Sequence, residues 1–405
     1  MGGAVCAADE VVFDDELPQP LTQFRVWVNE LSVGLLTHKL SMYNCRPAAA
    51  PFFGGMRHRC VITTLLVTST NSAIVTTFLP GQFNAAVAGL AAPFTLNNVA
   101  YDGVAARNEQ FPPRHATCLK ELGITLALVS TTTWASRDVA RFGPGDAGRT
   151  CRDARNFRVN GPEDARLLAL NATHVLALYA DFARGSRRMF RRSLDVRGFR
   201  LSEPLELSFA REAAGRLGAV EKNWSPFRRG ADVYVWQWLD DANGASAVHR
   251  LCVDAARLEP VAAVAGAGAA LREAVLGAGD ARRAKLSGGA PPARLNGSHY
   301  LGVGHVQRHR RWYTLFAYWF AAEPPFGFAA ATREFRFAVA AGGETAVDYD
   351  VATKPGVEDM IQFPVGLVVD GERALVTWGT NRNTESRATR VALAELEKGA
   401  RVVGR

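Results

Sequence analysis

The chain has 405 residues, of which 48% are hydrophobic and 21% are charged, so it can bury a large core and does not resemble a disordered protein. Its net charge of +8 comes mostly from arginine, but acidic residues are interspersed and no recognition helix or zinc-finger spacing accompanies the basic runs. We therefore expect no nucleic-acid partner, whereas a phosphate or a nucleotide sugar is compatible with this charge.

The first 22 residues are predicted to be an N-terminal extension. Acidic residues occur within 1–15, where a signal peptide needs a basic start and an apolar run. No window of about 20 apolar residues is present, so we expect no membrane span. The six cysteines form no CxxC pair and fit free thiols or one or two disulfides. The compartment stays open between the cytoplasm and the lumen of the secretory pathway.

Short strand patterns dominate residues 23–400. Runs of β-branched, aromatic or alternating apolar residues occur at 61–68, 124–132, 175–179, 233–238, 312–320 and 374–378. Each run is bounded by Gly, Pro, Asn or Asp, as strands in a sheet are. Strands at this density predict an all-β sandwich, barrel or propeller.

Two segments differ from this strand pattern. Residues 255–290 are rich in Ala and Gly, with a helical patch near 271–285, and we predict an insertion or a connection between sheets. Residues 391–398 predict a short helix that closes the chain.

Five short polar segments interrupt the strands. They contain SMYNCRP from residue 41, RNF and GPEDARL from 155, EKNWSPF from 221, GGAP, YLGVGH and PPF from 288, and FPVGL and TWGTN from 363. In this order they resemble the blade motifs of glycoside hydrolase family 130, which comprises β-mannoside phosphorylases, and of its mannosyltransferase relatives. The Glu-Asp-Pro-Arg motif of that family is similar to Glu163–Arg166, with Ala165 in place of Pro.

The resemblance implies one five-bladed β-propeller over residues 23–400, with four-stranded blades around a channel. The innermost strand of each blade presents side chains at one end of such a channel. Polar segments about one blade apart in the sequence can therefore meet in space. We predict that one set converges there: Asp164, Arg166, Lys222, Asn223 and His305.

The resemblance also implies the chemistry. The motif aspartate of the family acts as the proton donor through a sugar hydroxyl, which makes Asp164 the catalytic candidate. An inverting phosphorylase needs no second carboxylate, because phosphate attacks the opposite face. Arg166 and Lys222 are the candidates for binding phosphate. The candidates for binding sugar are Asn44, Glu163, Asn223, Trp224, His305 and Tyr313.

Each of these residues also has a structural interpretation. Gly-Pro-Glu-Asp is good turn chemistry, so Asp164 can belong to a turn. The two cations can form salt bridges, Trp224 can fill the core, and a lone His is usually structural. Asn381 and Asn383 stand where relatives of the family often show an Asp, which leaves their role open.

The predicted function is inverting transfer of a hexose, with mannose implied by the resemblance, between phosphate or a phosphate-bearing donor and a sugar acceptor. Inorganic phosphate or a nucleotide sugar would be the co-substrate, and we expect neither a cofactor nor a metal. Relatives place a cation after the EKNWSPF segment to hold phosphate, whereas 236–238 read Trp-Gln-Trp here. This departure argues against phosphorolysis in particular and leaves transfer from a nucleotide sugar open.

Two alternatives come from other classes. A hydrolase of the five-bladed arabinosidase, xylosidase or fructosidase type needs two or three placed carboxylates. Glu221, Asp240, Glu358 and Asp359 are available, although their motif context does not match. A non-catalytic propeller that binds glycans or proteins is the second alternative.

Overall fold

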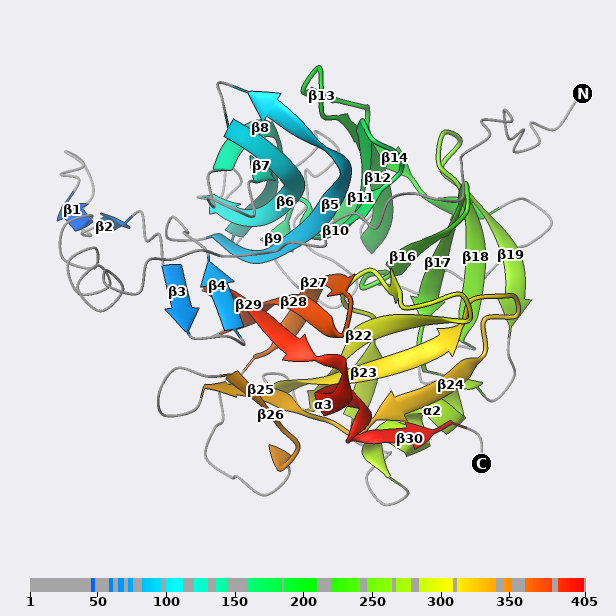
Figure 1. Cartoon of the computed structure of the whole chain (residues 1–405). Helices are drawn as coiled ribbons and strands as arrows, with labels where there is room; N and C mark the ends of the chain where they lie inside the picture. Colours follow the sequence, from blue (N-terminus) through cyan, green and yellow to red (C-terminus); the bar gives the residue numbers. More distant parts are fainter. Residues whose placement is uncertain are drawn as a thin grey trace, which may run out of the picture.

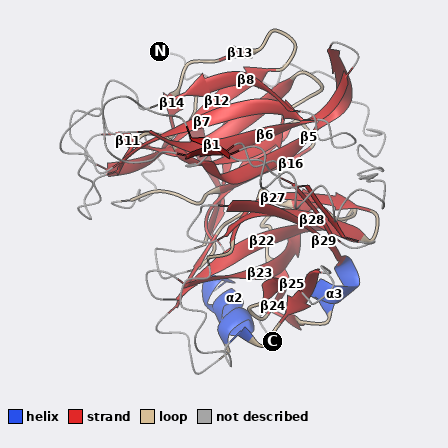
Figure 2. Cartoon of the chain, turned by 90° about the vertical axis from the view of Figure 1, so that its left-hand side faces the viewer, coloured by secondary structure: helices blue, strands red, loops and turns tan. Residues whose placement is uncertain are grey.

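The structure is a computed structural model whose described part is built almost entirely from strands (Figures 1 and 2). It describes residues 45–47, 58–60, 65–68, 72–75, 82–96, 99–111, 120–129, 136–143, 159–183, 186–209, 220–240, 246–263, 267–277, 284–308, 312–339, 345–351, 361–380 and 385–403. The sheets form five blades, which confirms the predicted all-β five-bladed propeller. Neither described helix is long and apolar enough to cross a membrane.

The first blade is an antiparallel sheet of four strands, and a short fifth strand pairs in parallel with the third of them. In order, these are β5 (Gln82–Leu96), β6 (Val99–Phe111), β7 (Lys120–Val129), β8 (Ser136–Phe142) and the added β9 (Val159–Asn160). Strand β7 accounts for most of the run predicted at 124–132. Apolar residues at alternate positions of β6 and of β7 pack into a core that is shared with the second blade.

The second and third blades have the same antiparallel order and each gains one short strand. The second contains β10 (Glu163–Ala169), β11 (His174–Ala183), β12 (Ser186–Asp195), β13 (Arg200–Leu201) and β14 (Leu205–Glu206). The third contains β15 (Ser208–Phe209), β16 (Ser225–Arg229), β17 (Asp232–Trp238), β18 (Ala247–Cys252) and β19 (Arg257–Ala263). Cys252 is disulfide-bonded, which agrees with one of the two predicted cysteine states.

The fourth blade has an interrupted edge. Its strands are β20 (Ala284–Ser287), β21 (Ala293–Arg294), β22 (His299–Arg308), β23 (Trp312–Ala321), β24 (Phe328–Thr332) and β30 (Ala400–Val402). Both β20 and β21 pair with β22, so they form one edge that breaks at the Gly-Gly-Ala-Pro segment. The break leaves backbone of the fourth blade free to approach the motif segment of the third.

The fifth blade lies beside the N-terminal strands. It contains β27 (Phe363–Asp370), β28 (Arg373–Thr380) and β29 (Glu385–Ala392). Strand β4 (Ser72–Val75), which pairs with β3 (Leu65–Thr68), lies next to β29 (Figure 1). The remaining described elements are β1 (Cys45–Pro47), β2 (His58–Cys60), β25 (Arg336–Val339), β26 (Thr345–Asp348) and helix α3 (Leu393–Glu397). Helix α3 lies within the helix predicted at 391–398.

The segment 255–290 differs from the predicted insertion. Its beginning is β19, an ordinary outer strand of the third blade, and its end is β20 of the fourth. Helix α2 (Ala267–Leu276) lies between them, four residues earlier than the predicted patch. Leu271 and Val275 of α2 pack into the core between these blades. The segment is therefore a helical connection between consecutive blades, which the Ala-rich sequence favours because alanine is a strong helix former.

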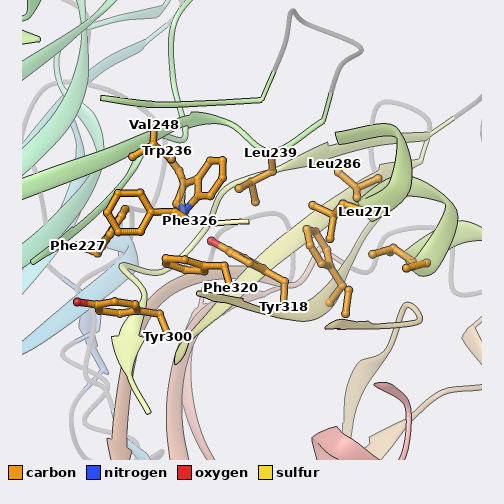
Figure 3. Close-up of a cluster of buried hydrophobic side chains, with 14 of the residues drawn as sticks. Phe227, Trp236, Leu239, Val248, Leu271, Leu286, Tyr300, Tyr318, Phe320 and Phe326 are labelled. Carbon is orange, nitrogen blue, oxygen red and sulfur yellow. The ribbon is translucent and has the colours of Figure 1, made fainter. Parts of the chain in front are cut away.

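An aromatic core joins the third and fourth blades (Figure 3). The ring of Phe227 lies 5.2 Å from Tyr300, 5.1 Å from Phe320 and 5.2 Å from Phe326, all edge to face. Phe326 ends the Pro-Pro-Phe part of the fourth motif segment and is fully buried. This part of the resemblance therefore reflects packing, and edge-to-face pairs of this kind stabilise by about 0.5–1.5 kcal/mol each beyond their burial.

Two hairpins contain turns with the same pattern of hydrogen bonds. In Asn171-Ala172-Thr173-His174 and in the corresponding residues from Asn296 to His299, the Asn Oδ1 accepts from the backbone N–H groups of the third and fourth residues. The hydroxyl of the third residue donates to the same Oδ1. These turns connect β10 with β11 and β21 with β22, so the second and fourth blades use the same turn at corresponding positions.

Candidate functional site

Asp164 lies at a β-bulge at the start of β10. Between Glu163 and Arg166 the chain advances three residues while its partner strand advances two, so one residue is extra. Asp164 has φ 57°, a left-handed conformation that residues other than Gly seldom adopt. Bulges re-aim side chains beside active sites, and strain of this kind concentrates at functional positions. The GPEDARL segment thus forms a bulged strand start.

Gly161 explains how the chain enters this bulge. Its φ is 96°, and a Cβ atom at this position would lie 2.1 Å from the Leu122 carbonyl oxygen of β7. Only glycine fits against the first blade there. The close approach places the start of β10 beside β6 and β7.

Asn108 of β6 holds Asp164 in place. The Asn108 Nδ2 donates to the Asp164 Oδ1 at 3.1 Å, and the Asp164 backbone N–H donates to the Asn108 Oδ1 at 3.2 Å. Both side chains are buried, Asn108 almost completely. One amide therefore satisfies the carboxylate and the backbone of the predicted catalytic residue at once.

Arg166 is a buried cation with unused donors. Only 1% of the residue is exposed, and its Nη1 donates to the Asp164 carbonyl oxygen at 3.2 Å. Its Nε and Nη2 are buried without a hydrogen-bond partner among the residues that the structure describes. Burial lowers the pKa of Arg166 to about 10, against the raising effect of Asp164, so the guanidinium stays charged at neutral pH. Unpaired buried donors are costly, which makes them candidates for binding an anionic ligand.

Glu163 faces a second buried cation. Arg187 of β12 lies 3.6 Å from the Glu163 carboxylate and donates from Nη1 to the Gly161 carbonyl oxygen at 2.6 Å. The Glu163 side chain is 18% exposed and that of Arg187 is 5% exposed. The sequence interpretation did not single out Arg187. Arg187 brings a cation from the second blade to the site. Residues 236–238 of the third blade, Trp-Gln-Trp, contain no cation.

Lys222 is electrostatically coupled to both carboxylates. Burial lowers the pKa of Lys222, but the charges of Glu163 and Asp164 raise it more, so its pKa lies above the ordinary value. The lysine is half-buried and stays protonated throughout the neutral range. Lys222 therefore lies within the electrostatic influence of Glu163 and Asp164.

Asn223 and Trp224 point to different environments. Asn223 has φ 64°, and its Oδ1 is buried without a partner among the described residues, as a ligand-binding amide would be. Trp224 is fully buried in the core between the second and third blades, and its Nε1 donates to Glu221 at 2.9 Å. The prediction that Trp224 stacks on a sugar is therefore wrong, because no face of its ring reaches solvent.

His305, Tyr313 and Phe363 form an aromatic group from the fourth and fifth blades. The His305 ring centroid lies 5.4 Å from that of Tyr313 and 4.7 Å from that of Phe363. Burial, followed by the charges of Arg166 and Lys222, lowers the pKa of His305 well below its usual value, so the ring is neutral. Its Nδ1 is buried and has no hydrogen-bond partner within the described part of the chain. Burial raises the pKa of Tyr313, which also interacts with Lys222 and Asp164.

Asp181 adds a carboxyl group that the sequence interpretation missed. It lies on β11, and burial raises its pKa to about 6, with Glu163 raising it and Arg187 lowering it. Its Oδ1 accepts from the Phe182 N–H at 2.6 Å. The site therefore contains three carboxyl groups, those of Glu163, Asp164 and Asp181.

All five blades contribute to this group. Its residues are Asn108 from the first blade, Glu163, Asp164, Arg166, Asp181 and Arg187 from the second, Lys222 and Asn223 from the third, His305 and Tyr313 from the fourth, and Phe363 from the fifth. The predicted residues Asn44, Asn381 and Asn383 lie outside the described residues. Asn108 had a detectable signal, since it follows Val104 and Ala106 at alternate buried positions of one strand.

Two of the carboxylates considered for an arabinosidase-type hydrolase, Glu221 and Asp240, have described side-chain partners outside this group. Glu221 is fully buried and accepts from Trp224. Asp240 is fully buried and accepts from Arg272 of α2 at 2.7 Å and from the Leu286 N–H at 2.9 Å. Both therefore anchor the framework. Glu358 and Asp359 lie outside the described residues.

A groove of about 710 Å³ lies at the other end of β10. Its lining includes Leu170, Asn171, His174, Arg191, Asp195 and Asp254. Asp195 accepts from the backbone N–H groups of Arg197 and Gly198, so its oxygens serve a turn. Because β10 is seven residues long, roughly 20 Å separates this groove from Asp164. It is a separate feature of the surface.

Comparison with known proteins gives a likeness of fold. No protein-family model matches the chain, and no curated protein matches it in sequence. A candidate glycosidase from Bacteroides thetaiotaomicron is 12% identical with a TM-score of 0.51, covering 87% of this chain and 97% of its own. This likeness extends over nearly the whole chain and supports the same architecture.

Two further solved structures are similar at lower scores. A glycosyl hydrolase from Bacteroides ovatus is 13% identical, with a TM-score of 0.48 and coverage of 78% of this chain and 85% of its own. A β-1,2-mannobiose phosphorylase from Listeria innocua is 12% identical, with a TM-score of 0.49 and coverage of 79% and 92%.

Proposed function

We propose that this protein is a carbohydrate-active enzyme that transfers a hexose, with inversion, between a phosphate-bearing group and a sugar acceptor. The observation that carries the proposal is the pair Asp164 and Arg166. A carboxylate held in a strained bulge lies beside a buried guanidinium with two unpaired donors. A proton donor next to an anion-binding group is what transfer to or from phosphate requires.

In the direction that breaks a glycosidic bond, a phosphate oxygen attacks the anomeric carbon, and the bond from that carbon to the leaving sugar oxygen breaks. Asp164 supplies the proton that the leaving oxygen takes up, through a sugar hydroxyl. In the synthetic direction the acceptor hydroxyl attacks the anomeric carbon of the donor and its proton passes to Asp164. Phosphate leaves when the donor is a sugar phosphate, and a nucleoside diphosphate leaves when it is a nucleotide sugar. Mannose is the hexose that the motif resemblance supports.

The cations have distinct roles in this scheme. Arg166 offers two donors from one plane, which suits two oxygens of a phosphate. Lys222 adds a point charge, and its raised pKa keeps it protonated. In this proposal Asn223, Glu163 and Tyr313 bind sugar hydroxyls. The neutral ring of His305 adds a hydrogen-bonding nitrogen without adding charge.

A hydrolase of the same architecture is the second candidate. The observation in its favour is Asp181, whose carboxyl pKa is raised to about 6 beside Glu163. A carboxyl group with such a pKa can exchange a proton with water near neutral pH, and inverting hydrolysis needs a second carboxylate of this kind. In that case water would replace phosphate as the attacking group.

A donor screen tests the proposal. Mannose 1-phosphate and GDP-mannose are each incubated with mannose as acceptor, and released phosphate or GDP is measured. β-1,2-Mannobiose is incubated with and without inorganic phosphate, and mannose 1-phosphate and free mannose are measured. Release from one of the phosphate-bearing substrates supports transfer. Free mannose without phosphate supports the hydrolase, and no turnover of any of these substrates overturns the proposed mannosyl transfer.

A further inference from the structure

Asn108 makes its two described hydrogen bonds with one residue. It lies on β6 of the first blade, is 1% exposed, and reaches Asp164 of the second blade, 56 positions along the chain. The buried amide of Gln362 bonds the backbone of one residue: it accepts from the Phe337 N–H and donates to the Phe337 carbonyl oxygen, both at 2.8 Å. Asn108 instead divides its bonds between the backbone and the carboxylate of Asp164.

The orientation of the Asn108 amide follows from its partners. The backbone N–H of Asp164 can only donate, so the amide atom that faces it must be the oxygen. The Nδ2 group then faces the Asp164 Oδ1 as a donor. A donor at Oδ1 favours that oxygen as the unprotonated one, because a proton there would face another hydrogen. A proton carried by Asp164 is therefore placed on Oδ2.

The same amide supports the strained backbone. Asp164 has φ 57°, a conformation that is unfavourable for residues with a Cβ atom. The bond from its N–H to the Asn108 Oδ1 is made in this conformation. Strained residues persist where surrounding contacts hold them, and Asn108 supplies one contact to the backbone and one to the side chain.

We infer that Asn108 is the positioning residue for Asp164: it fixes the carboxylate in the bulge and reserves Oδ1, so that Oδ2 exchanges the proton with the substrate. The inference rests on the proposed function, because it assumes that Asp164 transfers a proton. It goes beyond that function by assigning the first blade a part in catalysis, and by stating which oxygen acts.

The test is Asn108→Asp in the synthetic direction. This variant keeps an oxygen for the Asp164 N–H but replaces the donor with a second carboxyl group, and two adjacent carboxyl groups share a proton. Asp164 must be ionised to accept the proton of the acceptor hydroxyl. The acid limb of the pH–rate profile, measured with mannose 1-phosphate and mannose by release of inorganic phosphate, is expected to move upward by on the order of 1 pH unit.

A second variant separates position from protonation. Asn108→Ala removes both bonds, and kcat is expected to fall on the order of 10²-fold, because misplacing a catalytic group by about 1 Å has that effect. The KM for mannose 1-phosphate is expected to change much less, since Asn108 does not contact the anion-binding cations. Thr389→Val is the matched control: Thr389 is equally buried and accepts from the Trp378 Nε1 at 3.0 Å, far from Asp164 in the fold. It should lower stability without moving kcat or the profile.

The outcomes separate the two hypotheses. If Asp164→Asn keeps full activity, the proposed function fails, whatever the Asn108 variants do. If Asp164→Asn is inactive but Asn108→Asp has the profile of the wild-type protein, the positioning role is overturned while the function stands. If both Asn108 variants fail to fold while Thr389→Val folds, Asn108 is a framework residue and the inference is overturned.

Discussion

The guanidinium carbon of Arg166 lies 5.0 Å from the centroid of the Phe363 ring, which brings the second blade against the fifth. Phe363 begins the fifth motif segment, and its ring also contacts His305 of the fourth blade. A cation over an aromatic face is held in orientation without using its hydrogen bonds. The Nε and Nη2 donors of Arg166 are therefore fixed in direction and remain available to a ligand.

The first prediction is that Arg166→Lys weakens the binding of the phosphate-bearing substrate. Lysine keeps the charge but loses the planar pair of donors. Hydrogen bonds to a charged group contribute about 1.5–3 kcal/mol, so the KM for mannose 1-phosphate should rise about 10- to 100-fold. Initial rates at varied donor concentration measure this. Arg229→Lys, at an exposed ion pair with Glu323, is the control and should leave KM unchanged. An unchanged KM in Arg166→Lys would show that the guanidinium has only a structural role.

The second prediction concerns Asp164 and its backbone. Asp164→Asn should lower turnover by about 10²–10⁴-fold, because the general acid is lost. The fold should be retained, since asparagine tolerates a positive φ. Asp164→Ala should lose activity and also about 1–2 kcal/mol of stability, because alanine is strained at φ 57°. Thermal unfolding beside activity distinguishes the two variants. Equal stability of both would indicate that the bulge relaxes without this residue.

The third prediction separates anion binding from sugar binding. Lys222→Met retains most of the side-chain volume and removes the charge. We expect weaker use of mannose 1-phosphate, because Lys222 is a protonated cation beside Glu163 and Asp164 and the variant lacks this charge. Binding of a neutral mannoside should be nearly unchanged. Calorimetric titration with each ligand measures the difference. A parallel loss of both ligands would identify a structural lysine.

The fourth prediction is a pH dependence of stability from Asp181. Its pKa is about 6 in the folded protein and 3.8 in the unfolded chain, so the folded state holds the proton more tightly. As the pH rises from about 4 to 6, the unfolded state releases this proton first, and the contribution of Asp181 to stability falls. The penalty is complete only about one pH unit above the folded-state pKa.

Asp181→Asn should remove this penalty. The variant should be more stable than the wild-type protein at pH 7.5 by about 1–3 kcal/mol and similar to it at pH 4. Urea unfolding at both pH values measures this, with Asp232→Asn, at a partly exposed ion pair with Arg250, as the control. If Asp181→Asn differs in stability from the wild-type protein by the same amount at pH 4 and at pH 7.5, the carboxyl group of Asp181 is not desolvated. A loss of activity on stabilisation would place Asp181 in the reaction.

Strand patterns in the sequence were sufficient for the fold class. The apolar runs predicted at 175–179, 233–238, 312–320 and 374–378 all lie within strands β11, β17, β23 and β28. Local alternation and turn residues determine a strand, so these elements needed no tertiary information. The Ala-rich connection was harder to place, because helix propensity does not show where the flanking strands of two blades end.

The candidate site, like the fold, was predictable from the sequence only in part. The resemblance of the polar segments to known blade motifs predicted that Asp164, Arg166, Lys222, Asn223 and His305 belong to motif positions of successive blades. Only the tertiary structure decided which neighbours they have: Asn108 and Arg187 come from second or third strands of blades, and Trp224, adjacent to Asn223, turns into the core instead. The physical reason is that a propeller brings residues together by blade closure. Burial and pairing at the channel thus depend on contacts between segments that are distant in the chain, which no local pattern records.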